Sequence, residues 1–201
     1  MVKLLQTKQF SAYTSHEISA LLVVFFATNK DTHEFAGTLR KMKSKPTNLW
    51  VNRLPCYVNG VDTCGYTPVG YKHLLVVNID STECTSCGIS HLFEWKDWFE
   101  IMENKDMSFS VIFIFQPKND EILDIRNRLR RNSQIYKDIP LYLDVDGSFL
   151  KSNFDFRIPP IMQTMLLNDT GSIAYVGNPL INKTIKEDIL NIIKNKQNEK
   201  N

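Results

Sequence analysis

Residues 74–87 read LLVVNIDSTECTSC, and this stretch decides the fold. Its first six residues, LLVVNI, form an apolar run rich in β-favouring side chains. Such a run is typical of a strand that is covered on both faces, as in a parallel sheet. Two cysteines, Cys84 and Cys87, follow, and a helical pattern begins beside them. The stretch therefore predicts a buried strand that leads to two cysteines at the start of a helix.

The chemistry of Cys84-Thr85-Ser86-Cys87 depends on its position in the fold. A thiol at a helix N-terminus faces unpaired backbone N–H groups and the positive end of the helix dipole. Both effects favour the thiolate, which is the form that attacks a disulfide. A second cysteine three residues later lies one helical turn away, close enough to form an intramolecular disulfide. We expect Cys84 to be the exposed nucleophile and Cys87 to resolve the mixed disulfide.

Strands and helices alternate through the rest of the chain. From Ile89, large apolar residues recur at three- and four-residue steps and predict a helix with Trp95 and Trp98 in or beside the core. Asn119 is the expected N-cap of a helix over 119–132. Further expected elements are strands at 109–115, 141–145, 162–167 and 173–176 and a helix at 185–193. The order β-α-β-α-β, then a β-hairpin, then α, implies parallel strands with right-handed crossovers and an antiparallel close.

The segment at 29–69 predicts an N-terminal extension of this fold. A basic amphipathic helix is expected over 30–48, and short strands are expected at 49–51 and 56–58. Asn59-Gly60 is a good turn pair after the second of these strands.

The first 28 residues have the layout of a secretory signal. Residues 18–27 read ISALLVVFFA, with two lysines before them and a polar run after them. We therefore expect 1–28 to be a signal-like segment and the protein to lie in the cell envelope or periplasm. If 18–27 belongs to the fold instead, a cytoplasmic location is expected.

Composition excludes several classes of protein. A chain of 201 residues that is 43% hydrophobic can build a full core, which excludes disorder throughout. A formal net charge of +2 argues against a nucleic-acid partner. No apolar run reaches the roughly 20 residues of a transmembrane helix, so no stable membrane span is expected in the mature chain.

Over residues 70–196 the pattern resembles the thioredoxin-like superfamily. Residues 163–173, QTMLLNDTGSI, followed by Val176-Gly177-Asn178-Pro179, are similar to the hairpin of its bacterial envelope thioredoxin and peroxiredoxin-like branch. The resemblance implies a three-layer α/β/α sandwich with a mixed central sheet and an N-terminal extension. It also implies thiol–disulfide exchange by Cys84 and Cys87 without a cofactor. The implied partners are protein thiol or disulfide substrates and a recycling reductase or oxidase.

Two positions depart from that family. Glu83 stands before Cys84, where the family has an aromatic residue, and a carboxylate there raises the pKa of the thiol. Met162 aligns with the family's cis-proline, which faces the redox pair, and Pro159 and Pro160 come just before it. Loss of the cis-proline leaves the redox pair but puts the binding of peptide substrates in doubt.

Two other functions stay open. A thiol peroxidase of this fold needs a hydroxyl side chain three residues before its cysteine, which Ser81 supplies, and a proline where Val77 stands. In that case Cys84 reduces the peroxide. A redox-inactive binding module is the other alternative, with residues 30–70 docking a partner.

Structural and metal-binding interpretations compete with the redox interpretation at this site. Cys84 and Cys87 could form a purely structural disulfide, or bind zinc with His91 and one of Cys56 and Cys64. Gly88 stands where covalent haem attachment requires histidine, which excludes that motif. We expect neither a metal nor a cofactor.

Four further residues have simple structural interpretations. Cys56 and Cys64 could form a hairpin disulfide or a second redox pair, or remain thiols. His73 is expected at the surface. Asp80 is expected to be a loop carboxylate or cap, with proton acceptance from Cys87 as the alternative.

Overall fold

The computed structural model describes residues 29–63, 65–82, 85–104, 108–131, 133 and 138–195. The expected signal-like segment at 1–28 lies outside them. The strands are β1 Cys56–Val58, β2 Val61–Asp62, β3 His73–Ile79, β4 Phe109–Phe115, β5 Leu141–Leu143, β6 Thr164–Asn168 and β7 Ile173–Val176. The α-helices are α2 Asn29–Lys43, α3 Thr85–Ser90, α4 Lys96–Glu103, α5 Ile122–Arg131, α6 Ser148–Asn153 and α7 Lys183–Asn195. Short 3-10 turns are η2 Val51–Arg53, η3 Leu92–Trp95, η5 Asn119–Glu121 and η6 Pro160–Met162.

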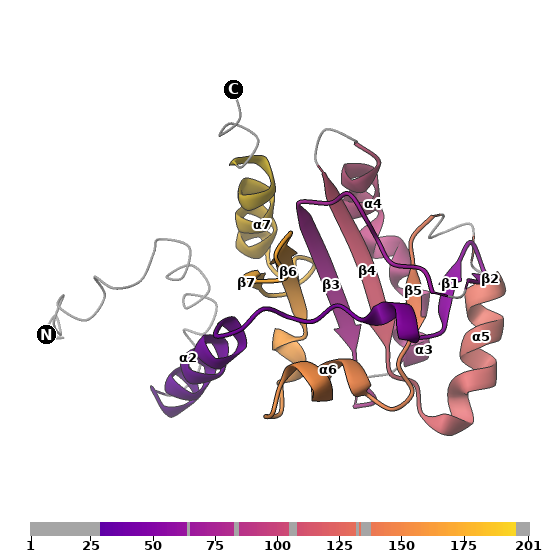
Figure 1. Cartoon of the computed structure of the whole chain (residues 1–201), viewed down its shortest axis with the longest axis horizontal. Helices are drawn as coiled ribbons and strands as arrows, with labels where there is room; N and C mark the ends of the chain where they lie inside the picture. The colour runs from indigo at the N-terminus through magenta and orange to yellow at the C-terminus, as the bar shows by residue number, and fades with distance from the viewer. Residues whose placement is uncertain are drawn as a thin grey trace, which may run out of the picture.

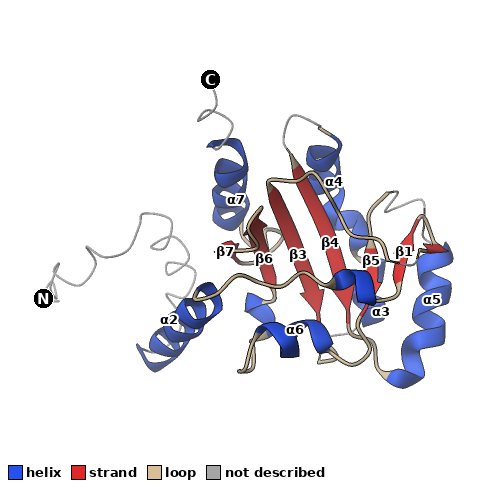
Figure 2. Cartoon of the chain, viewed as in Figure 1, coloured by secondary structure: helices blue, strands red, loops and turns tan. Residues whose placement is uncertain are grey.

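The described strands form a seven-stranded mixed sheet in the order β2-β1-β5-β4-β3-β6-β7 (Figures 1 and 2). β3 pairs in parallel with β4, and β4 with β5, while β6 is antiparallel to both β3 and β7. The expected parallel centre and antiparallel close are therefore confirmed. β1, from the segment before residue 70, joins the sheet antiparallel to β5.

Helices cover both faces of this sheet and produce the expected α/β/α sandwich (Figure 2). α3, α4, α5 and α7 pack on one face, and α2, α6 and the loops around them pack on the other. β3 serves both faces, with Leu75 and Val77 in the first cluster and Leu74 and Val76 in the second. This double burial explains why the strand is apolar at consecutive positions.

The chain between α2 and β1 crosses a face of the sheet (Figure 1). The prediction of a strand at 49–51 is wrong. η2 begins at Val51, and the backbone of the segment before it forms hydrogen bonds with a loop and a side chain. The N–H of Thr47 donates to Gly171 O at 2.8 Å, and that of Asn48 donates to Asn153 Oδ1 at 2.6 Å. The strand expected at 56–58 is confirmed, as is the turn at Asn59-Gly60, where both residues have positive φ.

Several expected helix boundaries shift. The helix expected to start beside the cysteines does begin at Thr85, but η3 interrupts it before α4 resumes, while Trp95 and Trp98 are buried as expected. Asn119 lies inside η5, and the preceding Lys118 N–H donates to the Glu121 carboxylate at 3.2 Å, so the expected N-cap is one residue too late. The sequence pattern did not predict α6.

Two further residues lie elsewhere than expected. His73 is 1% exposed, because β3 begins between β4 and β6 and not at a sheet edge. Met162 is in η6 and not in the fourth strand, because β6 begins at Thr164.

Candidate redox site

Cys87 is an exposed residue of α3, and it is disulfide-bonded. α3 begins three residues after the Asp80–Thr82 loop that leaves the end of β3. Cys84 lies in this connection, outside the described residues. The strand therefore leads directly into the motif, as the sequence predicted.

The helix that carries Cys87 is held against the ends of the two central strands. Thr85 is fully buried, and its hydroxyl donates to Gln116 O at 3.4 Å, just beyond β4. A Cβ on Gly88 would lie 2.8 Å from Ile79 Cδ1, so glycine permits this close approach. The helix is thus docked on the end of the sheet while Cys87 faces solvent.

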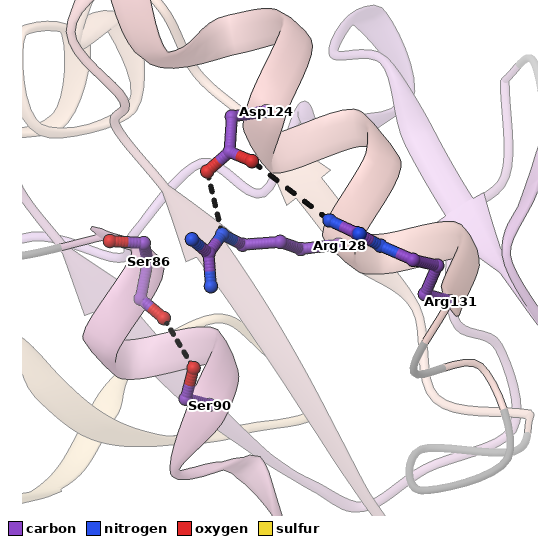
Figure 3. Close-up of polar contacts among 5 residues, drawn as sticks. All are labelled: Ser86, Ser90, Asp124, Arg128 and Arg131. Carbon is purple, nitrogen blue, oxygen red and sulfur yellow. Dashed lines mark hydrogen bonds and ion pairs between the residues drawn. The ribbon is translucent and has the colours of Figure 1, made fainter.

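α5 packs beside α3 and brings positive charge near it. Arg128 Nε donates to Asp124 Oδ2 at 2.6 Å, and Arg131 lies 4.0 Å from the other oxygen of that carboxylate. Figure 3 shows the Arg128 side chain extending from α5 toward the turn of α3 between Ser86 and Ser90. α5 therefore places an ion pair, Arg128 with Asp124, beside the helix of Cys87.

Cys56 differs from Cys87 in its exposure and in its bonding. It is a free thiol, fully buried in β1. Burial raises its pKa to about 11, an effect that its hydrogen bonds with Tyr142 and Leu141 reduce only in part. A hairpin disulfide with Cys64 is therefore wrong, and Cys56 remains a thiol, which was one of the alternatives. Cys64 itself lies outside the described residues.

His91 takes part in a local surface contact. Its Nδ1 lies 2.7 Å from Glu94 Oε1, one turn along the chain, and both side chains are exposed. Within the described ranges no three histidine, cysteine, aspartate or glutamate side chains gather in a way that could hold a metal ion. Cys56, one of the proposed zinc ligands, is in the core.

Asp80 is the carboxylate that opens the loop toward the cysteines. Partial burial by itself raises its pKa, but hydrogen bonds from Thr82 and Gln163 and the charge of Arg157 outweigh burial and lower it. Thr82 donates both its N–H, at 2.8 Å, and its hydroxyl, at 2.5 Å, to Asp80 Oδ1. Asp80 is therefore an ionised loop cap, as the simpler interpretation held.

The residue directly before β6 is Gln163, and not Met162 as the alignment placed it. Gln163 is 1% exposed, and its amide joins three segments: Asn78 Nδ2 donates to its Oε1 at 2.6 Å, while its Nε2 donates to Asp80 Oδ2 at 2.5 Å and to Ile158 O at 3.2 Å. Pro160 forms the first residue of η6, and the described residues contain no cis peptide bond. A buried amide therefore directly precedes β6.

A cavity of about 410 Å³ opens beside this network. Asp80, Ser81 and Gln116 line one side of it, at the ends of β3 and β4. Residues of α6 and of the loop at 154–158 line the other. The sequence did not indicate this cavity, because its walls come from segments up to 78 residues apart that only the sheet brings together.

Comparison of the sequence with protein-family models and with curated proteins finds no match. Comparison of the structure with solved structures does. A thioredoxin-like protein in its oxidised form aligns with a TM-score of 0.51 at 12% identity, over 77% of this chain and 98% of the other. The chain has a thioredoxin-like fold. At this identity the likeness establishes the fold alone.

Two other solved structures align with lower TM-scores. An exposed lipoprotein thioredoxin from Streptococcus pneumoniae aligns with a TM-score of 0.43 at 19% identity, over 63% of this chain and 86% of that one. A hypothetical protein from Sinorhizobium meliloti aligns with a TM-score of 0.40 at 14% identity, over 54% of this chain and 57% of the other.

In the part of the chain that the structure describes, every helix is too short or too polar to cross a membrane.

Proposed function

We propose that this thioredoxin-like protein is a thiol–disulfide oxidoreductase, with Cys84 the attacking thiol and Cys87 the resolving thiol. One observation carries the proposal: an exposed, disulfide-bonded Cys87 lies on the helix that follows the central strand. Cys56 is a free buried thiol, and of the two other cysteines in the chain, Cys84 stands three residues before Cys87 in the sequence. We propose Cys84 as the disulfide partner on this ground.

The reaction transfers two electrons from the protein dithiol to a substrate disulfide. The Cys84 thiolate attacks one substrate sulfur, the substrate S–S bond breaks, and the other substrate sulfur leaves as a thiolate that takes up a proton. The Cys87 thiolate, after losing its proton, then attacks Cys84, which releases the second substrate thiol and leaves a Cys84–Cys87 disulfide. A dithiol reductant restores the pair, and in the opposite direction the same couple oxidises a substrate dithiol.

The environment of the pair affects the thiolate in two opposite ways. The ionised Asp80 carboxylate before the loop disfavours a thiolate, and the Arg128 guanidinium beside α3, which is already paired with Asp124, offsets this only in part. We further propose that the chain is exported and works in the cell envelope.

The test uses a chain that begins near Asn29 and carries Cys56→Ala and Cys64→Ala. Equilibration with glutathione and dithiothreitol buffers should give a reversible two-electron couple between about −120 and −270 mV. Cys87→Ser should accumulate a mixed disulfide on Cys84, and Cys84→Ser should not react. A pair that stays oxidised below about −300 mV would make the disulfide structural and overturn the proposal.

A second assay separates disulfide exchange from peroxide reduction. The reduced protein is treated with hydrogen peroxide and sulfenic acid on Cys84 is trapped and measured against free cysteine. We expect no rate advantage, because Val77 stands in β3 where a peroxidase of this fold requires proline. Oxidation many times faster than free cysteine would favour the peroxidase instead.

A further inference from the structure

The cavity at the ends of β3 and β4 has the size and the lining of a ligand site. Its volume of about 410 Å³ lies within the range of roughly 300–1,000 Å³ that is typical of small-molecule sites. Large apolar side chains come from α6 and the loop after it, and they are Leu150, Phe154, Phe156 and Ile158. Phe154 and Ile158 belong to the core on this face of the sheet, and the other two pack against it. The apolar part of the lining is therefore held in place by the fold.

The charged groups around the cavity balance one another. Asp80 and Asp155 supply two negative charges, and Lys151 and Arg157 supply two positive charges. The charge of Arg157 already stabilises the Asp80 carboxylate, and Lys151 Nζ donates to the backbone carbonyl of Asp146. The lining therefore has no net charge, and we expect it to give no advantage to an ion of either sign.

Two uncharged polar side chains of the lining have no hydrogen-bond partner among the described residues. They are the Gln116 carboxamide, directly after β4, and the Ser81 hydroxyl, in the loop after β3. Gln116 is held through its backbone alone, because its N–H donates to Ile79 O at 2.8 Å and its carbonyl accepts the Thr85 hydroxyl at 3.4 Å. The nitrogen and the oxygen of its side chain stay available to a ligand.

Gly147 leaves room for the Gln116 carboxamide at the cavity wall. A Cβ at position 147 would lie 2.6 Å from Gln116 Nε2 and 2.9 Å from Oε1, so the amide group lies against the bare backbone of this lining residue. Gly147 also has a φ of +63°, which disfavours a side chain there. The wall therefore presents a donor and an acceptor side by side, and another amide with the same pair on one edge can form two hydrogen bonds with them.

We propose that this cavity binds a neutral flat ring that carries a primary carboxamide or a ring lactam. The amide of the ligand pairs with the Gln116 carboxamide, and the ring packs against Phe154 and Phe156. A carboxylate of the same shape has no donor for the Gln116 oxygen, and an amidinium has no acceptor for the Gln116 nitrogen. Either ion must also lose hydration, for which the balanced lining offers no compensating net charge. The site does not depend on the cysteine pair, so the inference goes beyond the proposed function.

The test compares benzamide, benzoate and benzamidinium, which share one ring and one planar shape but are neutral, negative and positive at pH 7. Each probe is titrated into the ¹⁵N-labelled full chain, and the backbone amide signals are followed by NMR. We expect benzamide to give saturable shifts at Ser81, Gln116 and Gly147. Its dissociation constant should be about tenfold lower than that of either ion, the size of effect that one hydrogen bond provides.

Three variants complete the design. Gln116→Glu keeps the shape of the side chain but replaces the amide by a carboxylate, so benzamidinium should now bind more tightly than benzamide. Leu150→Trp, which fills the apolar part of the cavity, should weaken the binding of all three probes. Asn127→Asp makes the same chemical change on the exposed face of α5 and should leave the order of the probes as it is in the wild type. Unshifted signals from β3 and β4 check that each variant is folded.

Several results would overturn the inference. They are the absence of saturable shifts with benzamide, equal affinities for the three probes, and a Gln116→Glu variant that still prefers benzamide. Equal effects of Gln116→Glu and Asn127→Asp would do the same. None of these measurements involves thiol chemistry, so their failure is distinct from a failure of the proposed oxidoreductase function.

Discussion

Gln163 Nε2 lies 2.5 Å from Asp80 Oδ2, which ties the residue directly before β6 to the residue directly after β3. Asn78, opposite Gln163 at the end of the pairing between the two strands, bonds the same amide through its side chain. Asn78 and Gln163 are buried and Asp80 is half-buried, and such polar groups are costly unless they find partners, which here they supply to one another. The network fixes the loop that leads to the cysteines.

Asp80 should make the free energy of unfolding depend on pH in the acidic range. Its folded-state pKa lies below the unfolded value, so its contribution is present above the unfolded pKa of about 3.9 and is lost as pH falls through the folded pKa. Asp80→Asn should therefore lower the free energy of unfolding at pH 7 and flatten its decline below about pH 5. Urea unfolding at pH 7 and pH 3 measures both effects. Parallel pH profiles for wild type and variant would show that the carboxylate is not held as described.

Asp97→Asn provides the comparison for this experiment. Asp97 also has a lowered pKa, through its hydrogen bond and charge contact with Lys186, but it is fully exposed. Its contribution should disappear in 1 M salt, where exposed charges are screened. The contribution of Asp80, which rests on hydrogen bonds, should persist.

Cys56 should be inert in the folded protein. A pKa raised to about 11 from 9.0 lowers its thiolate fraction near neutral pH about 100-fold, and burial adds a steric barrier. We expect iodoacetamide at pH 8 to label Cys56 at least about 100 times more slowly than free cysteine, as followed by mass spectrometry. Labelling in 8 M urea should restore the ordinary rate. Fast labelling of the native protein would contradict the buried position in β1.

Trp98 should contribute to the free energy of unfolding through its buried volume and not through its indole N–H group. It is fully buried, its ring centre lies 5.9 Å from that of Phe109, and its Nε1 has no hydrogen-bond partner among the described residues. Trp98→Ala should cost about 3–5 kcal/mol of the free energy of unfolding. Trp98→Phe should cost less than half as much, because no hydrogen bond is lost and much of the volume remains. Equal costs in urea titrations would indicate an essential polar role for the indole.

Asn153 should anchor the segment between α2 and η2. Its buried side chain accepts Asn48 N–H at 2.6 Å and donates to Asn48 O at 3.1 Å and to Phe149 O at 2.9 Å. Asn153→Ala should cost about 1–3 kcal/mol, because it leaves the half-buried backbone N–H and carbonyl of Asn48 without their partner. Hydrogen exchange at Asn48 should accelerate more than exchange in β3. Ser152→Ala, which removes the exposed Trp50 Nε1 bond, is the matched control and should have a small effect.

Much of the fold was readable because its signals are local. The runs at 74–79 and 109–115 became β3 and β4, and the expected hairpin became β6 and β7. Predictions from local patterns were wrong where contacts with distant segments determine the structure. The apolar residues at 49–51 pack beneath α6 without pairing to a strand, and His73 is buried by β4 and β6, which lie on either side of it.

The candidate site also contains residues that the sequence predicted and residues that it did not. Spacing alone indicated Cys84 and Cys87 and placed them between a strand and a helix. It did not indicate Gln163 as the residue before β6, since a glutamine in a polar turn has no sequence pattern that marks burial. Its partners Asn78 and Asp80 are more than 80 residues away.

The sequence by itself determined the order of strands and helices and the position of the thiol motif, because hydrophobic period and cysteine spacing are properties of neighbouring residues. The tertiary structure decided which cysteine is buried and inert, which polar groups satisfy one another at the end of β3, and where a cavity forms beside those groups. Those outcomes depend on the register of β3 with β6 and on the docking of α6, which bring together segments that are distant in the chain.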